Sequence, residues 1–463
     1  MFGHSFLRIN SSYNSRLLSY AINYAANADS STENGVVFAL KGLFGGYFGK
    51  YSLLPYYDKL KEYKDTEQRD IWEYNLNLTQ KETKQMFRHI WELNNTYSYY
   101  YFFTENCSYN MLWLLESGRG SLHLREHFRY QVIPLETVHV LKEENLITST
   151  HYRPSKREIL LTYEKLLKQK YRTFPLALIQ EKIKISSIVK DKSISIEQKR
   201  YIFEASVEYL EYLYSQSKVK KEKYLQLFHS FTTQRAKLGT TKPLAVQKPA
   251  DPLDGHQSIR MQFGAGTTNN TFEEYFGIRA TYHSLDDSGY GFLRGTQIEF
   301  LDFLFSYSKQ DKIEVQKATI LSIVSLTQRS TFFKSLSWRT KFGWDKNYLN
   351  KDTNFYGGVG AGFSWGDKYG YIYTLVDPFF YYTSYILGGL NGSLGIHIDK
   401  YKNFTTNVEL SHRIYANTKE QTLFEFTQGF RLSQNQQLSL LYFYKEKNGA
   451  NENNIQVKFR YYF

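Results

Sequence analysis

The sequence lacks two features that commonly identify secreted and membrane proteins, paired cysteines and long apolar runs. Its 463 residues contain one cysteine, Cys107, so no intramolecular disulfide can form and the redox compartment stays open. No run of about eighteen apolar residues occurs, which excludes a transmembrane helix. A membrane β-barrel is not excluded, because its strands carry apolar residues only at every second position.

The charge balance is basic, yet the sequence has no nucleic-acid-binding motif. The formal net charge is +13, and the Lys and Arg residues are dispersed along the chain. We therefore expect no nucleic-acid partner and favour an anionic membrane surface or simple solvation. Aromatic residues are abundant, with 41 Tyr and 34 Phe, although the mean hydropathy is only −0.51. Aromatic girdles of a barrel give such a composition.

Residues 248–463 alternate apolar and polar side chains in about twelve segments separated by Asn, Asp, Gly and Lys turns. In the last segment, Ile455, Val457, Phe459, Tyr461 and Phe463 alternate with polar residues. The pattern predicts an all-β antiparallel barrel of about 12 strands that spans a membrane. A soluble barrel or sandwich is the alternative. A final aromatic residue in an alternating strand is similar to the assembly signal of bacterial outer-membrane barrels.

Residues 151–247 change to a helical pattern rich in Lys, Glu and Leu. Helices are predicted over 155–171, 175–185, 196–215 and 220–231. The charge runs indicate solvated faces, with membrane-surface contact as a lesser alternative, and no chemistry is legible in this region. A linker rich in proline follows at 243–255.

The first 150 residues contain the candidate chemistry. Asn106 is suited to cap a helix that begins at Cys107, where unpaired N–H groups and the helix dipole favour the reactive thiolate. Cys107 is therefore a candidate nucleophile, although a lone cysteine also occurs as a small buried hydrophobe. His4 begins a short predicted strand and is the candidate base that accepts the thiol proton.

Residues 1–26 are predicted to form a hairpin whose two strands bring His4 near Ile22 or Asn23. Asn23 is then a candidate to orient the imidazole, although a polar residue on a half-exposed strand needs no catalytic purpose. The predicted catalytic residues are thus Cys107, His4, Asn23 and Asn106. The glycine-rich stretch 42–49 is either an apolar flap over a lipid cleft or a packed loop.

Further local predictions complete this region. Residues 72–78 alternate as a strand, and a capping box at Thr79 and Glu82 starts a helix through about Tyr97. Residues 128–134 read as a strand before a short helix at 137–145. Glu105 is expected to be a loop carboxylate with a local or electrostatic role. No second ligand accompanies the scattered histidines His89, His123, His127 and His139, so we predict no metal and no cofactor.

Four motifs carry a resemblance to a known family. The stretches at residues 1–9, 17–26, 41–47 and 105–109 resemble the signature of the Lnb-type periplasmic domain, which includes bacterial lipoprotein N-acyltransferases. The order of His before Cys also resembles permuted papain-like enzymes. The resemblance implies an α+β papain-like (permuted) N-terminal domain, a helical insert and then the barrel. It also implies catalytic roles for His4 and Cys107.

The combined hypothesis is a thiol-dependent acyltransferase at the outer membrane, with its N-terminal domain in the periplasm. Membrane phospholipid would be the acyl donor and, by the resemblance, a lipoprotein N-terminus the acceptor. A Cys/His peptidase or amidase acting on cell-wall peptide is one alternative, and a non-enzymatic plug of a transport barrel is another. The motif starts at Met1, so we expect an export signal upstream of it.

Overall fold

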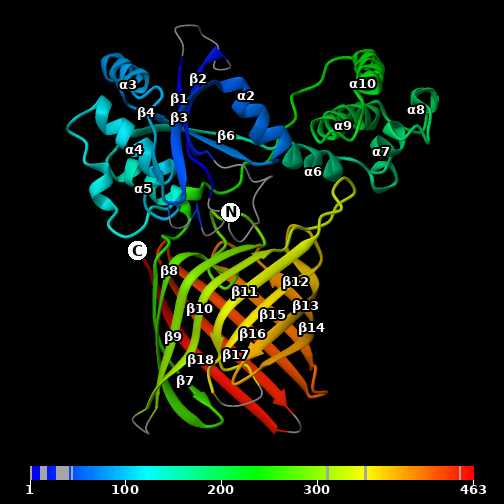
Figure 1. Ribbon diagram of the computed structural model, residues 1–463. Helices are drawn as coiled ribbons and strands as arrows, with labels where there is room; N and C mark the ends of the chain where they lie inside the picture. The colour runs from blue at the N-terminus through cyan, green and yellow to red at the C-terminus, as the bar shows by residue number, and fades with distance from the viewer. Residues whose placement is uncertain are drawn as a thin grey trace. The chain divides into compact units, whose positions relative to one another are not determined.

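The computed structural model describes residues 3–10, 18–27, 41–42, 45–308, 312–348, 352–447 and 450–463. Contacts divide the chain into two compact units, residues 2–248 and 249–463 (Figure 1). Each unit is described by itself below. Among the described residues, none of the helices combines the length and apolarity that a membrane-crossing helix needs.

Two antiparallel sheets organise the N-terminal region. The larger has the order β1-β2-β3-β5 and the smaller pairs β4 with β6. In the predicted hairpin, Leu7 pairs with Ile22, whereas its turn lies outside the described residues. The strands are β1 (Leu7–Ile9), β2 (Tyr20–Ala26), β3 (Tyr47–Pro55), β4 (Ile71–Leu76), β5 (Ser98–Tyr100) and β6 (Ile147–Arg153).

Helices cover both faces of the larger sheet. On one face, Ile22 and Tyr24 belong to a core that includes Met111 and Leu112 of the apolar helix α4. On the other face, Ala21 packs in a second cluster with Tyr56 and Tyr63. The helices of this region are α2 (Tyr56–Lys61), the π-helical turn η2 (Glu62–Thr66), α3 (Gln80–Glu92), α4 (Cys107–Gly118), the 3₁₀ turn η3 (Leu124–His127) and α5 (Pro134–Glu143).

Two local predictions need correction. The capping box of α3 is present, but the helix ends at Glu92 rather than near Tyr97, because two hydrogen-bonded turns and the left-handed Asn95 follow it. Residues 128–134 form no strand. The Val132 N–H donates to Phe103 and its carbonyl accepts from Asn106, so these groups hold the loop before α4 instead of pairing with a strand. The α+β class is confirmed, and the permuted papain-like connectivity stays a prediction.

The helical region continues from β6. Its longest helix contacts three of the others, and the buried Lys156 pairs with Glu208 and Glu211 of that helix. The helices are α6 (Lys156–Leu166), η4 (Gln169–Tyr171), α7 (Phe174–Ile179), α8 (Ile185–Lys190), α9 (Ile196–Ser215) and α10 (Lys221–Ala236).

The second unit is a closed antiparallel barrel of 12 strands, as predicted (Figure 1). Closure occurs where β18 pairs with β7, which leaves no open edge. After the short η5 (Pro252–Asp254), the strands are β7 (Arg260–Thr268), β8 (Thr271–His283), β9 (Thr296–Ser308), β10 (Lys312–Ser325), β11 (Ser337–Asp345), β12 (Asn354–Gly366), β13 (Gly370–Tyr382), β14 (Ile386–Ile398), β15 (Phe404–Tyr415), β16 (Glu420–Ser433), β17 (Gln436–Lys447) and β18 (Ala450–Tyr462).

The barrel buries polar side chains and exposes apolar ones. In β18, Lys458 and Arg460 are buried, whereas Ile455, Val457 and Phe459 are exposed. This is the reverse of a soluble core and is the polarity that a lipid environment requires. The alternative of a soluble barrel or sandwich is therefore disfavoured.

The longest connections of the barrel lie at the end where the chain enters it. Residues 284–295 and 326–336 join strands at this end. The first connection packs against the entering segment, because the backbone of Gly255 lies directly against Gly291. The entering segment also contacts the barrel wall, where Arg431 of β16 and the following Gln434 donate to carbonyls of residues 253–255. The entering segment and the connection are thus packed together at this end of the barrel.

Candidate active site

Cys107 occupies the first position of α4 and is buried, with 4% of its surface exposed. The helix starts here because Asn106 supplies the cap. Asn106 Oδ1 accepts from the backbone N–H of Ser108 at 3.0 Å and of Tyr109 at 3.3 Å. The thiol therefore lies at the positive end of a helix dipole, as predicted from the sequence.

Asn106 also ties the loop before the helix to a distant segment. Its Nδ2 donates to the carbonyl oxygens of Phe102 at 3.0 Å and Val132 at 2.7 Å. All of these contacts are made by a side chain that is itself buried. Asn106 thus holds the position of Cys107. Within the described part of the chain, no hydrogen bond joins its side chain to the thiol.

His4 and Asn23 lie together, as the hairpin predicted. His4 Nε2 is 2.6 Å from Asn23 Oδ1, and the ring stacks on Tyr63 with centroids 5.9 Å apart. An amide oxygen only accepts, so Nε2 carries the proton, and Nδ1 is left to face the thiol. His4 and Cys107 act on each other's pKa through hydrogen bonding and charge, so the two side chains are neighbours. The three side chains form a chain of contacts in the order Cys107, His4, Asn23.

The two titrating groups shift in opposite directions. Burial raises the pKa of Cys107, but the hydrogen bond and charge of His4 outweigh it, so the pKa of the thiol is lowered. Burial lowers the pKa of His4, but the hydrogen bond and charge of Cys107 raise it more. Both shifts favour a thiolate–imidazolium pair.

Three further residues contact the thiol and were not identified from the sequence. The Ser5 backbone and the Ser108 hydroxyl both hydrogen-bond to Cys107, the hydroxyl with Oγ 3.8 Å from Sγ. Tyr100 is a neighbour of Cys107: burial raises the pKa of the Tyr100 phenol, the charge and side chain of Cys107 raise it further, and the Cys107 backbone lowers it. A sequence signal existed for Tyr100 alone, because it lies within the aromatic run 97–103 that leads into Asn106 and Cys107.

The remaining sequence candidates are dispersed. Glu105 is exposed in the loop before α4. Three of the four histidines pair singly with glutamates, namely His89 with Glu92, His123 with Glu126 and His127 with Glu144. The glycine-rich stretch is only partly within the described residues, since residues 43–44 lie outside them.

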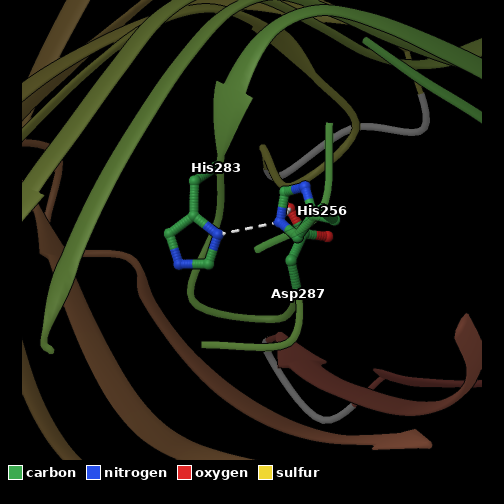
Figure 2. A group of neighbouring side chains, drawn as sticks. All are labelled: His256, His283 and Asp287. Atoms are coloured by element: carbon green, nitrogen blue, oxygen red, sulfur yellow. Dashed lines mark hydrogen bonds and ion pairs between the residues drawn. The ribbon is translucent and has the colours of Figure 1, made fainter. Parts of the chain in front are cut away.

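A second polar cluster, inside the barrel, was not predicted from the sequence. Figure 2 shows that the rings of His256 and His283 meet beside Asp287, with His256 Nε2 3.0 Å from His283 Nδ1. His256 Nδ1 donates to the Gln257 carbonyl at 2.6 Å, so Nε2 accepts from His283. The signal that could have indicated it, a histidine at the entrance to the barrel, is weak.

This cluster has metal-binding residue types, with ligand atoms within 4.8 Å of one another. Its surroundings do not fit a cation. Both oxygens of Asp287 already accept hydrogen bonds, from Arg260 at 3.2 Å and Arg279 at 2.6 Å, and Arg460 is 3.4 Å away. The Asp287 carboxylate is therefore already compensated by guanidinium groups, and no lone carboxylate charge remains for a cation. The cluster is a structural network that ties the entering segment to the barrel wall.

The comparisons with known proteins follow this division. Residues 1–144 match the Lnb N-terminal periplasmic domain. Residues 150–246 match a domain of unknown function (DUF7842), and residues 249–462 match another (DUF7840). No curated protein matches this chain.

Solved structures with some likeness to the barrel include two membrane channels. The KdgM porin has a TM-score of 0.29 and 11% identity, covering 44% of this chain and 99% of its own. An outer membrane channel from Pseudomonas putida F1 has a TM-score of 0.30 and 10% identity, covering 49% of this chain and 100% of its own.

The family match and the polarity of the barrel together give the location. This is an outer-membrane protein with its N-terminal domain in the periplasm. Its residues 1–144 match the Lnb N-terminal periplasmic domain, and a helical region connects them to a closed 12-strand barrel.

Proposed function

We propose that this protein is a cysteine acyltransferase that takes a fatty acyl group from a membrane phospholipid. The observation that supports it is the contact chain of Cys107, His4 and Asn23 at the start of α4. A lowered thiol pKa and a raised imidazole pKa are the two conditions that thiol catalysis needs.

The reaction divides into two balanced steps. The Cys107 thiolate attacks the ester carbonyl carbon, the C–S bond forms, and the C–O bond to glycerol breaks. The His4 imidazolium gives its proton to the departing alcohol oxygen, which leaves a thioester and a lysophospholipid. A primary amine then attacks the thioester, neutral His4 takes the amine proton, and the C–S bond breaks to restore the thiolate–imidazolium pair.

The charge that develops on the carbonyl oxygen needs donors beside Sγ. The backbone N–H of Cys107 and the hydroxyl of Tyr100 are candidates, because Tyr100 interacts with both the backbone and the side chain of Cys107. Preorganised donors of this kind stabilise an oxyanion by about 2.7–4 kcal/mol each. We assign the α-amino group of a lipoprotein as the acceptor from the family resemblance.

The barrel is best suited to an anchoring role in this scheme. Several of its inward side chains are buried and pair with one another across strands. Arg339 bonds to Asp377, with Nη2 2.6 Å from Oδ2, and to Glu409, with Nη1 2.8 Å from Oε2. Attachment to a membrane protein keeps the domain beside its lipid donor and raises the effective donor concentration. Because these inward side chains already pair with one another, we disfavour the alternative of a transport barrel that is plugged by the N-terminal domain.

Intact-protein mass spectrometry of the detergent-solubilised chain mixed with phospholipid tests the proposal. We expect an added acyl mass that hydroxylamine removes, that Cys107→Ser abolishes and that His4→Gln strongly reduces. His123→Gln is the matched control, because the His123 side chain is 69% exposed and pairs with Glu126. Absence of any adduct after rapid quenching, with amine withheld, would contradict acyl transfer, and cleavage of a cell-wall peptide added in a parallel sample would favour the amidase.

A further inference from the structure

An aromatic patch made of Phe48, Tyr97 and Tyr99 lies uncovered at the β3–β5 edge of the larger sheet. The three side chains are 42%, 62% and 57% exposed. They pack on each other, with the Phe48 ring centroid 4.6 Å from Tyr97 and 5.2 Å from Tyr99. Single exposed apolar residues are ordinary, whereas a packed exposed group indicates an interaction surface.

Trp91 is a further exposed aromatic residue and precedes the patch in the sequence. It is 75% exposed at the last turn of α3. Two tight turns follow it, since the Asn94 N–H donates to the Trp91 carbonyl at 3.2 Å and the Thr96 N–H to the Leu93 carbonyl at 3.0 Å. The backbone between Trp91 and Tyr97 is therefore compact.

The patch shares a sheet face with the candidate site. Asn23 pairs with Ser52 across β2 and β3, and side chains two residues apart point to the same face. Phe48 is two such steps from Ser52, so it lies roughly 13 Å along that face from the position of Ser52. A fatty acyl chain is long enough to cover this distance.

Cationic side chains adjoin the aromatic ones. Lys50 is exposed on β3 and, two residues from Phe48, points to the same face. On α3, Lys84 and Arg88 are exposed and lie seven and three residues before Trp91, which places them on the same side of the helix. Tyr and Trp next to Lys and Arg are typical of protein surfaces at the headgroup level of a bilayer.

We propose that the aromatic patch and Trp91 dock on the surface of a phospholipid bilayer, with Lys50, Lys84 and Arg88 at the lipid phosphates. The barrel of the same chain keeps such a surface always within reach of the domain. The docked face brings acyl chains to the sheet face that leads to Cys107, a last step that rests on the proposed function.

The test uses the full chain in lipid nanodiscs. Because Cys107 is the only cysteine, a Cys107→Ser background allows one new thiol to be labelled with an environment-sensitive fluorophore. The label goes on Tyr97→Cys, and the matched control is Glu222→Cys on α10, which is exposed in the helical region. Lipids brominated in the acyl chain quench only a label that enters the bilayer.

We expect the label at residue 97 to lose roughly half of its fluorescence, since interfacial groups reach the headgroup–acyl boundary, and the label at 222 to lose none. Adding Phe48→Ser and Tyr99→Ser should reduce the quenching at residue 97. Equal, low quenching at both positions overturns docking. A blue-shifted but unquenched label, in detergent as well, means a protein partner and overturns it too.

The outcome is separable from that of the proposed function, because the Cys107→Ser background cannot form a thioester. Quenching without acyl transfer in the wild-type chain would reject the enzyme but keep the docking surface. Thioester formation from detergent-dispersed phospholipid without quenching would do the reverse.

Discussion

At the residue scale, the thiol of Cys107 is controlled by opposing influences. Burial alone would make it a poor thiolate, and it is His4, Ser5 and Ser108 that reverse the effect. The sequence placed Cys107 at a helix start and His4 in a strand, but the donors Ser5 and Ser108 depend on how the two segments meet. A lone cysteine without these neighbours would be an inert core residue.

Removing the imidazole should raise the pKa of the thiol. In His4→Ala, Cys107 keeps its burial but loses the hydrogen bond and charge that lower its pKa. Thiolate absorbance in the ultraviolet, with Cys107→Ser as the blank, should show a midpoint below the ordinary value of about 8.5 in the wild type and above it in His4→Ala. An unchanged midpoint would mean that the two side chains do not interact.

The pH dependence of thioester formation should be a bell. The rate rises as pH increases through the lowered pKa of Cys107, because thiolate forms, and falls as pH increases through the raised pKa of His4, because the proton for the leaving alcohol is lost. Single-turnover rates with phospholipid across pH measure both limbs. A rate that rises without a second limb would show that His4 does not act as the acid.

Asn23→Ala should slow thioester formation by roughly tenfold to a hundredfold, since a hydrogen bond to a charged group contributes about 1.5–3 kcal/mol. The bond in question joins Asn23 Oδ1 and His4 Nε2 at 2.6 Å. Asn27→Ala is the control, because Asn27 is exposed just after β2. Rescue by Asn23→Gln, and an altered upper limb of the pH profile, would distinguish orientation of His4 from a loss of folding.

At the element scale, α4 begins at the residue that its local sequence predicts, whereas residues 128–134 do not form the strand predicted for them. The cap was legible because Asn106 precedes an apolar run, a pattern contained in a few residues. The irregular structure of residues 128–134 could not be predicted, because the Val132 backbone hydrogen-bonds to Phe103 and Asn106, which are distant in sequence. A strand propensity was overridden by a tertiary partner.

Asn106→Ala should destabilise the N-terminal unit by about 1–3 kcal/mol, because it removes a helix cap and leaves the buried Val132 carbonyl without its donor. Thermal unfolding in detergent, followed by intrinsic fluorescence, should show a transition lowered by roughly 2–4 °C for each kcal/mol. Asn110→Ala, on the same helix with partly exposed amide contacts, should change it little. Equal shifts of the unfolding temperature in Asn106→Ala and Asn110→Ala would mean that the Asn106 contacts contribute no more to stability than those of Asn110.

At the scale of the whole molecule, the barrel has polar and charged side chains inside and apolar side chains outside, and networks of ion pairs connect its strands. Arg279 has no exposed side-chain surface and bonds to Asp287 at 2.6 Å. Asp287 comes from the connection at residues 284–295, at the end where the chain enters. The network therefore joins the wall and this connection, which an open pore would not require.

Arg279→Met should destabilise the barrel by about 3–5 kcal/mol, because breaking a buried ion pair leaves its partner charges poorly compensated. Lys312→Met, at an exposed position on β10, should be nearly neutral. Urea unfolding in lipid vesicles measures both. A neutral Arg279→Met would mean that water reaches the network and that the barrel interior is open.

The sequence by itself determined those features whose signal is local. Alternation of period two indicated about 12 barrel strands, apolar spacing defined α9 at its observed bounds of Ile196–Ser215, and the short hairpin placed His4 near Ile22 or Asn23. Each of these depends on neighbours in the chain or on one turn.

Only the tertiary structure decided what surrounds these features. Tyr100 next to Cys107, the aromatic patch on the face of Asn23, and Asp287 among the arginines of β7, β8 and β18 all join residues from separate segments. Their positions follow from sheet register and barrel closure, which are collective properties of many pairings. No single stretch of the chain specifies them, because each contact exists only after every intervening strand has paired.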